Sequence, residues 1–265
     1  MSADQRGRRY DTAEARSTWD FAAESYDGFQ RTGNDYYRFT FFGPAHVALC
    51  GDVEGLDVLD LGCGNGYFSR EMATRRAHVI GIDLSEKQIN LAWAHEKEEP
   101  LGIDYRVMDA ERAVEHFRQA SFDLVTACVS LGDMPEPGRA IGGAFQLLRP
   151  GGRLVASITH PCTDLPLREW DRDEQGNKRA LKIGRYFEGG VVNYRWRGPR
   201  FPYEFSTSTP HFTLAQWLNW FIDVGFVLKR IEEPHPSDAA LAAQPDLGDA
   251  ALVPEFLLID AQKPG

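Results

Sequence analysis

The stretch 58-VLDLGCGNGYFSREM-72 decides the fold, because three closely spaced glycines join a run of branched apolar residues to a helix-forming segment. A short apolar run is typical of a buried parallel strand. Glycine permits a tight turn and lets a ligand approach the backbone with no Cβ in the way. The stretch therefore predicts a strand, a ligand-binding turn and a helix. Its spacing is GxGxG, whereas dinucleotide-binding folds more usually show GxGxxG.

Short apolar runs and helical patterns alternate along the rest of the chain. The predicted strands are 57-DVLDLG, 78-HVIGID, 103-IDYRVMD, 122-FDLVTACVS and 152-GRLVASITH, with helices at 66–76, 85–98, 111–118 and 137–148. A helix at 213–225, a strand at 226–233, an Ala/Pro/Asp-rich loop and a last strand at 254–263 follow. The alternation predicts an α/β fold with an open, mostly parallel sheet and helices on both faces.

Two segments stand outside this alternation. In the first, 14–29 and 35–50 have helical spacing, the latter interrupted near Gly43-Pro44. The second, 162–210, is rich in Gly, Pro, Arg and aromatic residues and is too long for a simple connection. Within it, 185–198 favours a hairpin that turns at Gly189-Gly190.

Composition and charge exclude several classes of protein. The chain has 265 residues, of which 43% are hydrophobic, enough for one large core. Its net charge of -10 argues against a nucleic-acid partner, although residues 168–200 carry nine basic and five acidic residues. No apolar run approaches the ~18 residues of a membrane span, and the N-terminus lacks a secretory segment. The four cysteines form no CxxC pair, so no metal site or disulfide is predicted and a reducing cytoplasm is expected.

Carboxylates stand at the ends of three predicted strands, where open parallel sheets bind their ligands. Asp60 precedes the glycine turn, Asp83 ends the second strand, and Asp109, followed by Ala110, ends the third. Asp83 can accept hydrogen bonds from both hydroxyls of a ribose, although an aspartate here also commonly caps a helix. Three acidic strand ends are unfavourable for phosphates and suit a nucleoside with a cationic amino-acid tail.

This arrangement resembles the class I S-adenosylmethionine-dependent methyltransferases of the small-molecule type, over about residues 17–160 and again over 213–263. Further motifs of that family are 128-CVSLGDMPE-136 and 147-LLRPGGRLVASI-158. The resemblance implies a seven-stranded Rossmann-like sheet of order 3-2-1-4-5-7-6 with an antiparallel last strand. It also implies S-adenosyl-L-methionine as the cofactor and S-adenosyl-L-homocysteine as the product.

The resemblance further implies which residues hold the cofactor. Asp60 and the Gly62 backbone would meet the methionine amino group, Asp83 the ribose and Leu84 the adenine face. Asp109 with Ala110 would meet the adenine edge, and Tyr26 resembles the tyrosine of a lid over the methionine end. The complete set of implied cofactor-binding residues is Tyr26, Asp60, Gly62, Gly64, Gly66, Asp83, Leu84, Asp109, Ala110 and Cys128.

With this resemblance, the chain divides into four expected parts. Residues 1–55 form an N-terminal helical lid and 56–161 the cofactor-binding core. Residues 162–210 form an insert that caps the substrate, and 211–265 complete the core with a helix and the last two strands.

Candidate catalytic residues follow the fourth and fifth predicted strands. Methyl transfer needs a nucleophile held in line, and a base where that nucleophile holds its proton tightly. His160 comes directly after the fifth strand, Asp133 lies in the loop after the fourth, and His211 precedes the next helix. For His160, fixing the loop before Pro161 is an equal alternative. For His211, a structural role beside the helix cap is favoured over catalysis.

Aromatic residues of the lid and the insert are candidates for the acceptor pocket. The main candidates are Trp19, Tyr37, Tyr186, Tyr194 and Trp196, with Tyr36, Phe41, Trp170, Phe187 and Tyr203 as further ones. An aromatic and arginine-rich cap suits a small organic acceptor with a ring or a carboxylate. The same surface could instead be a contact between copies in a homo-oligomer.

The leading hypothesis is a cytoplasmic enzyme that methylates a nitrogen or oxygen of a small metabolite in bacterial specialised metabolism. One alternative is an RNA methyltransferase in which Arg185, Arg195, Arg197 and Arg200 contact phosphates. Another is a cofactor-binding protein without transferase activity. The GxGxG spacing is unfavourable for a nucleotide-dependent dehydrogenase.

Overall fold

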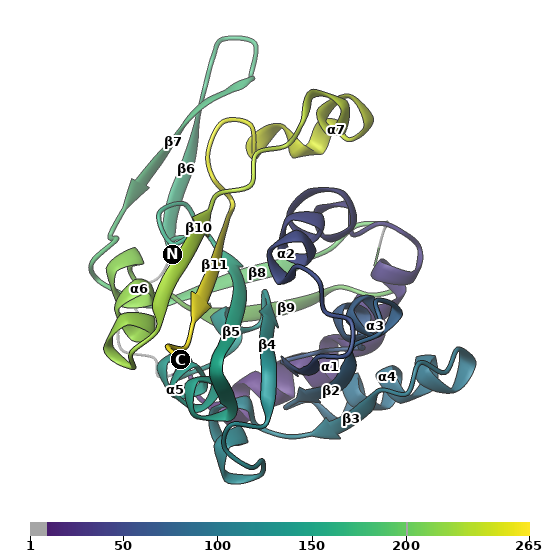
Figure 1. Cartoon of the computed structure of the whole chain (residues 1–265). Coiled ribbons are helices and arrows are strands. Elements are labelled where there is room, and N and C mark those ends of the chain that lie inside the picture. Colours follow the sequence, from purple (N-terminus) through teal and green to yellow (C-terminus); the bar gives the residue numbers. More distant parts are fainter. Residues whose placement is uncertain (1–9, 200) are drawn as a thin grey trace.

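A seven-stranded sheet of order β10-β11-β5-β4-β1-β2-β3 forms the centre of the computed structural model, which describes residues 10–199 and 201–265 (Figure 1). Five strands are parallel: β1 (Asp57–Leu61), β2 (His78–Asp83), β3 (Asp104–Val107), β4 (Phe122–Cys128) and β5 (Leu148–Thr159). The last strand, β11 (Phe256–Gln262), runs antiparallel between β5 and β10 (Val227–Glu232). The predicted α/β fold and strand order are therefore confirmed, because β10 and β11 are the sixth and seventh strands of this sheet.

Helices cover both faces of the sheet because successive residues of a strand point to opposite sides. Val58 packs in the cluster formed with α2 (Phe42–Cys50), α3 (Tyr67–Thr74) and α4 (Glu86–Glu98). Leu59 packs in the other cluster, with α5 (Pro137–Leu147), α6 (Leu214–Asp223) and the 3₁₀ helix η3 (Ala110–Glu115). Both side chains are fully buried, so β1 lies at the centre of the core and its carboxyl end is held firmly.

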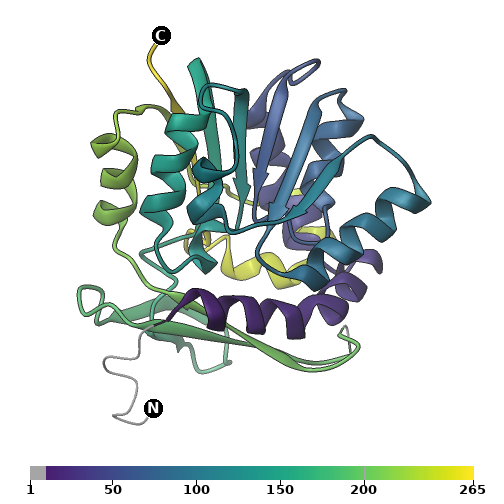
Figure 2. The ribbon, with the colours of Figure 1, turned by 90° about the horizontal axis from the view of Figure 1, so that it is seen from below.

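The N-terminal helix and part of the insert lie side by side beneath one end of the sheet (Figure 2). The helix is α1 (Thr12–Arg31), and the insert contributes the hairpin β8 (Val191–Trp196)–β9 (Phe205–Pro210). Ser25 Oγ of α1 donates to the Tyr203 carbonyl over 2.7 Å, and Tyr203 Oη donates to the Phe21 carbonyl over 2.8 Å. The rings of Phe29 and Phe201 stack with centroids 4.5 Å apart. We call α1 and this hairpin the two-part lid.

The insert differs from its prediction in the place of its turns. It holds two hairpins, and the first, β6 (Leu167–Arg172)–β7 (Lys178–Gly184), projects from the rest of the molecule (Figure 1). The predicted hairpin turning at Gly189-Gly190 is wrong, because β8 pairs with β9 rather than with the residues before it. The two glycines have positive φ and lie in the link between β7 and β8.

Two other segments differ from prediction in detail. Residues 35–50 form a π-helical turn, η2 (Tyr37–Phe41), which runs into α2 at Phe42, so the break precedes Gly43-Pro44. A Cβ at Gly43 would collide with the Arg38 carbonyl, so glycine is needed for this close approach. The predicted loop after β10 contains two short helices, α7 (Asp238–Ala243) and η5 (Pro245–Asp249). Among the helices of the described residues, none is long and apolar enough to cross a membrane.

Candidate functional site

A cavity of about 630 Å³ lies between the carboxyl ends of the parallel strands and the two-part lid. A volume of this order holds a small-molecule ligand. One part, the strand-end half, is lined by Asp60, Gly62–Gly64, Asp83, Leu84, Asp109 and Ala110. The other part, the lid half, is lined chiefly by Trp19, Asp133, Asp164, Arg168, Tyr194, Trp196 and Glu255.

The glycine turn is shaped by the strand beside it. The N–H groups of Gly62 and Cys63 donate to the Ile82 carbonyl over 2.8 and 2.9 Å. Gly62 has a φ of 67°, and a Cβ there would lie 2.5 Å from Cβ of Ser130. Such a Cβ would force the loop after β4 away, so glycine at position 62 keeps the two loops in contact.

Gly66 has a different role from the one expected of it. It does not line the cavity; a Cβ on it would collide with the ring of Tyr105. Its φ of 88° allows it to precede α3 directly. The third glycine of the motif thus lets the helix pack closely on the sheet.

Asp83 is fixed by backbone donors at the end of β2. Its Oδ2 accepts the Gly64 N–H over 2.9 Å and its Oδ1 the Ser85 N–H over 2.8 Å. Burial raises the pKa of Asp83 to about 6, against the opposing effect of these two hydrogen bonds. Asp83 is therefore a desolvated carboxyl in a fixed position, well suited to bind a hydroxyl or a cation.

Asp60 is a second buried carboxyl, at the end of β1. It is 1% exposed and accepts a hydrogen bond from Ser69 Oγ over 2.6 Å. Burial raises its pKa to about 7, and the nearby charge of Asp83 adds to this shift. A positively charged ligand group in the strand-end half would stabilise the ionised form of both carboxyls.

Nine of the ten residues implied as cofactor-binding lie around the cavity, and Gly66 does not. Asp109 is held at the start of η3, where its Oδ1 accepts the Glu111 N–H over 2.9 Å. Leu84 and Ala110 contribute apolar surface beside it.

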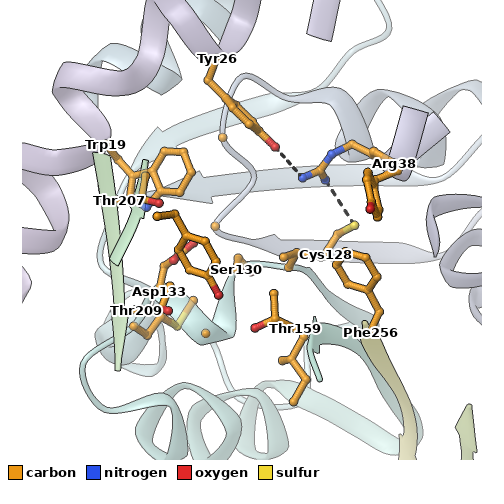
Figure 3. Close-up of a pocket in the computed structure, with 18 of the residues that line it drawn as sticks. Trp19, Tyr26, Arg38, Cys128, Ser130, Asp133, Thr159, Thr207, Thr209 and Phe256 are labelled. Atoms are coloured by element: carbon orange, nitrogen blue, oxygen red, sulfur yellow. Dashed lines mark hydrogen bonds between the residues drawn. The ribbon is translucent and has the colours of Figure 1, made fainter. Parts of the chain in front are cut away.

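Arg38 is a cavity residue that the sequence did not single out. It extends from η2 and donates to Asp35 Oδ2 and Tyr26 Oη, each over 3.1 Å, and to Cys128 Sγ over 3.5 Å. Figure 3 shows its guanidinium between Tyr26 and Cys128. Arg38 and Arg168 are the only cationic side chains among the described residues that line the cavity. The aromatic run 36-YYRFTFF-42 was the available signal, but it resembled ordinary helical core.

These residues fit a nucleoside that carries a charged amino-acid tail. The fixed Asp83 and the apolar Leu84 and Ala110 suit a ribose and an aromatic base. Gln88 lines the same half, and its buried Oε1 has no hydrogen-bond partner among the described residues. An unpaired buried oxygen of this kind is normally satisfied by a ligand or water. Asp60 suits an ammonium group, and Arg38 suits a carboxylate.

Three carboxyls characterise the lid half. Asp133, in the short helix η4 (Leu131–Asp133), accepts no side-chain hydrogen bond from the described residues, and burial with the charges of Asp83 and Asp164 raises its pKa to about 8. Asp164 Oδ2 accepts a short hydrogen bond from Tyr194 Oη. Burial also raises the pKa of Glu255, which interacts with the Tyr37 hydroxyl.

The two histidine candidates lie outside the cavity. His160 is 3% exposed, accepts the Cys162 N–H on Nδ1 over 3.2 Å and donates from Nε2 to Glu233 over 2.9 Å. His211 places its ring nitrogens 3.2 and 3.1 Å from the carbonyls of Asp164 and Tyr186. Each contacts a loop in this way, which was an equal alternative for His160 and the favoured interpretation for His211.

The aromatic candidates separate into wall residues and structural residues. Trp19, Tyr37, Tyr194, Trp196 and Trp170 line the cavity. Tyr186 does not: its hydroxyl accepts the Leu214 N–H over 2.7 Å at the start of α6. Phe187 is 88% exposed.

Comparisons with known proteins agree with this geometry. The family described as "Methyltransferase domain" matches residues 59–156. A ubiquinone biosynthesis O-methyltransferase of Aromatoleum aromaticum is 42% identical over 106 residues, which cover 40% of this chain and 44% of that protein. The chain thus spans less than half the length of this curated relative.

Similarity to solved structures extends over most of the chain. An S-adenosylmethionine-dependent methyltransferase from Mesorhizobium loti is 33% identical with a TM-score of 0.69, covering 83% of this chain and 96% of that one. A 1,6-didemethyltoxoflavin-N1-methyltransferase from Burkholderia thailandensis has the same fold, with a TM-score of 0.58 and 17% identity over 96% of this chain and 88% of that one. That structure contains 1,6-didemethyltoxoflavin and S-adenosylhomocysteine.

Proposed function

The chain belongs to the class I S-adenosylmethionine-dependent methyltransferases, and we propose that it methylates a nitrogen or oxygen of a small molecule in bacterial specialised metabolism. The observation that carries this proposal is the continuity of the cavity. The strand-end half, which fits the cofactor, opens into a lid half lined by aromatic side chains and carboxyls. A small acceptor in the lid half would be held against the cofactor and away from water.

The cofactor's parts are assigned to the strand-end half by their chemistry. Asp83 holds the ribose hydroxyls, Leu84, Asp109 and Ala110 surround the adenine, and Asp60 faces the ammonium group. Arg38 is proposed to meet the carboxylate through its Nη atoms, which contact Tyr26 and Cys128 at the cavity wall, while its Nε stays paired with Asp35. When bound, the cofactor supplies a methyl group on a positively charged sulfur, which a nucleophile takes with its own electron pair.

Asp133 is proposed as the base that receives the acceptor's proton. It lines the cavity beside the acidic and aromatic groups of the lid half, and no described side chain pairs with its carboxyl. A pKa of about 8 lies close to neutral pH, where the carboxyl can both take up and release a proton. His160 and His211 are proposed to position the loops around the cavity instead.

The surface of the insert supports a small acceptor better than RNA. Arg185 pairs with Glu188, and Arg195 pairs with Glu204 over 2.9 Å. Arg197 is exposed, and Arg200 lies outside the described residues. Arginines paired to neighbouring acids are poor phosphate contacts, because the carboxylate must first be displaced. The four cysteines are free thiols, which suits the proposed cytoplasmic location.

A methyl-transfer screen tests this function. The protein would be incubated with S-adenosylmethionine and separate panels of amines, phenols and carboxylates, followed by mass spectrometry for a methylated product. Methylation of a small molecule, absent with Asp83→Ala, is the expected result. Tight cofactor binding without turnover on any panel would favour a non-catalytic binding protein. Methylation of RNA alone would favour the nucleic-acid alternative.

A further inference from the structure

We infer that the methyl acceptor is an amine carried on a compact ring or apolar body, and that Asp164 is the residue that selects it. This inference rests on the proposed function, since it assigns the acceptor of the same cavity. It differs from the expectation of a carboxylate-bearing acceptor, which depended on the many arginines of the insert. Among the described arginines of the insert, Arg168 is the one that lines the cavity.

The charge of the lid half favours a cation. Asp133, Asp164 and Glu255 line it, with Arg168 as the opposing charge. The Arg168 side chain is 46% exposed, and its Nη1 donates to the Thr163 carbonyl over 3.2 Å. Arg168 and Lys178 both act on Glu255, and Arg168 also pairs with Asp164. Asp133 forms no ion pair with a described residue and its pKa is raised by burial, so an ammonium group beside it would stabilise its ionised form.

Asp164 provides a specific acceptor atom within this environment. Its side chain is 9% exposed, and Oδ2 is occupied by the Tyr194 hydroxyl. The other oxygen, Oδ1, forms an ion pair with Arg168 Nη1 at 3.6 Å. This distance is beyond hydrogen-bond range, and Oδ1 accepts no hydrogen bond from the described residues. A buried carboxylate oxygen without a donor is costly, so a ligand N–H that reached it would be bound strongly.

The walls around these carboxyls also suit an amine with an apolar body. Trp19 and Trp196 both make edge contacts with Tyr26, at centroid distances of 5.6 and 5.9 Å. Trp196 Nε1 donates to Thr207 Oγ1 over 2.9 Å, which fixes its ring. Figure 3 places Trp19, Thr207, Thr209 and Asp133 on the same side of the cavity. Aromatic faces attract ammonium groups and pack against apolar rings.

In this proposal Asp133 accepts the proton of the acceptor, and the sulfur of the bound cofactor would keep the electrons of the broken bond. The ammonium form of the acceptor gives one proton to the Asp133 carboxylate, which leaves a lone pair on nitrogen. That lone pair forms the bond to the methyl carbon, while the electrons of the carbon–sulfur bond remain on sulfur. The methylated product carries the positive charge, and Asp133 returns its proton to water.

Three probes of similar size test the inference: 2-phenylethylamine, 2-phenylethanol and 3-phenylpropionate. Each would be titrated into the protein saturated with S-adenosylhomocysteine, with the fluorescence of the cavity tryptophans as the signal. We expect the amine to bind about tenfold more tightly than the alcohol or the carboxylate, as a buried charge-assisted hydrogen bond requires. Equal or tighter binding of the alcohol or the carboxylate would overturn the inference.

Two variants identify the selecting residue. Asp164→Asn should remove most of the preference for the amine. Asp171→Asn should keep it, because Asp171 lies on β6 outside the cavity, where it pairs with Lys182. A folded Asp164→Asn protein with an unchanged preference would contradict the role of Asp164. Should that variant fail to fold, Glu255→Gln must reduce the amine preference, and no reduction would equally contradict the inference.

Calorimetry of S-adenosylhomocysteine alone separates this inference from the proposed function. Binding of the product with no preference for the amine would leave the proposed function standing and overturn only the acceptor class. Failure of the product to bind would overturn both.

Discussion

The two halves of the cavity are held in place by different kinds of contact. In the strand-end half, Asp83 accepts two backbone N–H groups, and Asp60 is held by Ser69 one turn into the following helix. In the lid half, Asp164 is held by the hydroxyl of Tyr194 from a distant hairpin, and Trp196 by Thr207. The first half is part of the sheet, whereas the second depends on segments that must dock onto it.

This difference explains how one fold can keep its cofactor and change its acceptor. The strand-end residues lie between β1 and η3 and are fixed by the geometry of adjacent parallel strands. The lid residues come from α1, η4, the loop after β5, the insert and the start of β11. If the lid half holds the acceptor as proposed, substitutions there would change the acceptor site and leave the strands of the sheet in place.

The largest effect is expected at Asp133, the residue of the lid half that is proposed as the general base. Asp133→Asn should lower turnover about 100-fold or more while cofactor affinity changes little, because a general base contributes about this much. Since the Asp133 pKa is raised to about 8, its ionised form accumulates as the pH rises through 8, and wild-type kcat should rise with it.

A pH profile of kcat for both proteins checks this prediction, with the rise near pH 8 absent from the variant. His160→Ala is the control, because His160 lies outside the cavity and pairs with Glu233. A greater loss of turnover in His160→Ala than in Asp133→Asn would reverse the assignment of the base.

A smaller effect, on both stability and cofactor affinity, is expected at Gly62, where the glycine turn contacts the loop after β4. Gly62→Ala should lower both stability and cofactor affinity, because its Cβ would press on Ser130 and its φ is positive. Strain of this kind costs about 1–3 kcal/mol. Gly55→Ala is the matched control, since Gly55 has a φ of 72° and nothing within 4 Å of its added Cβ. Equal melting temperatures and cofactor affinities for the two variants would argue against the clash.

The smallest effect concerns the attachment of the lid to the core. Asp27 of α1 accepts hydrogen bonds from Asn65 of the glycine turn and from His95 of α4, over 2.8 and 2.7 Å. Burial tends to raise the Asp27 pKa, but these contacts outweigh it and lower the pKa overall. Because the folded-state pKa of Asp27 lies below the unfolded-state pKa of ~3.9, ionised Asp27 stabilises the folded protein above pH ~3.9. This stabilisation is lost as the pH falls through the folded-state pKa.

Thermal unfolding from pH 7 to pH 3 measures this contribution. The melting temperature of the wild type should fall more steeply on acidification than that of Asp27→Asn, which lacks the titrating group. A variant with the same pH dependence as the wild type would show that this contact contributes little to the lid.

The sequence predicted the location of most strand-end residues, because they follow a regular pattern of strands and turns, although Gly66 does not line the cavity. Asp60, Asp83 and Asp109 lie at or just after the carboxyl ends of adjacent strands, and the parallel pairing of these strands brings them to one edge. The lid half was predicted less well, because its contacts join distant segments, such as Ser25 with Tyr203 and Tyr194 with Asp164. No local pattern separates Arg38 from a helix-surface arginine, or His160 from a catalytic histidine.

The central claim is that the strand ends bind the cofactor through carboxyls fixed by the backbone. Calorimetry of S-adenosylmethionine binding to Asp83→Ala tests it most directly. Asp104→Ala is the control, since Asp104 is a half-exposed carboxylate at the amino end of β3, away from the cavity. Loss of charge-assisted hydrogen bonds should weaken binding by about 1.5–3 kcal/mol, or about tenfold to 100-fold, in Asp83→Ala alone. Unchanged affinity in that variant would contradict the account.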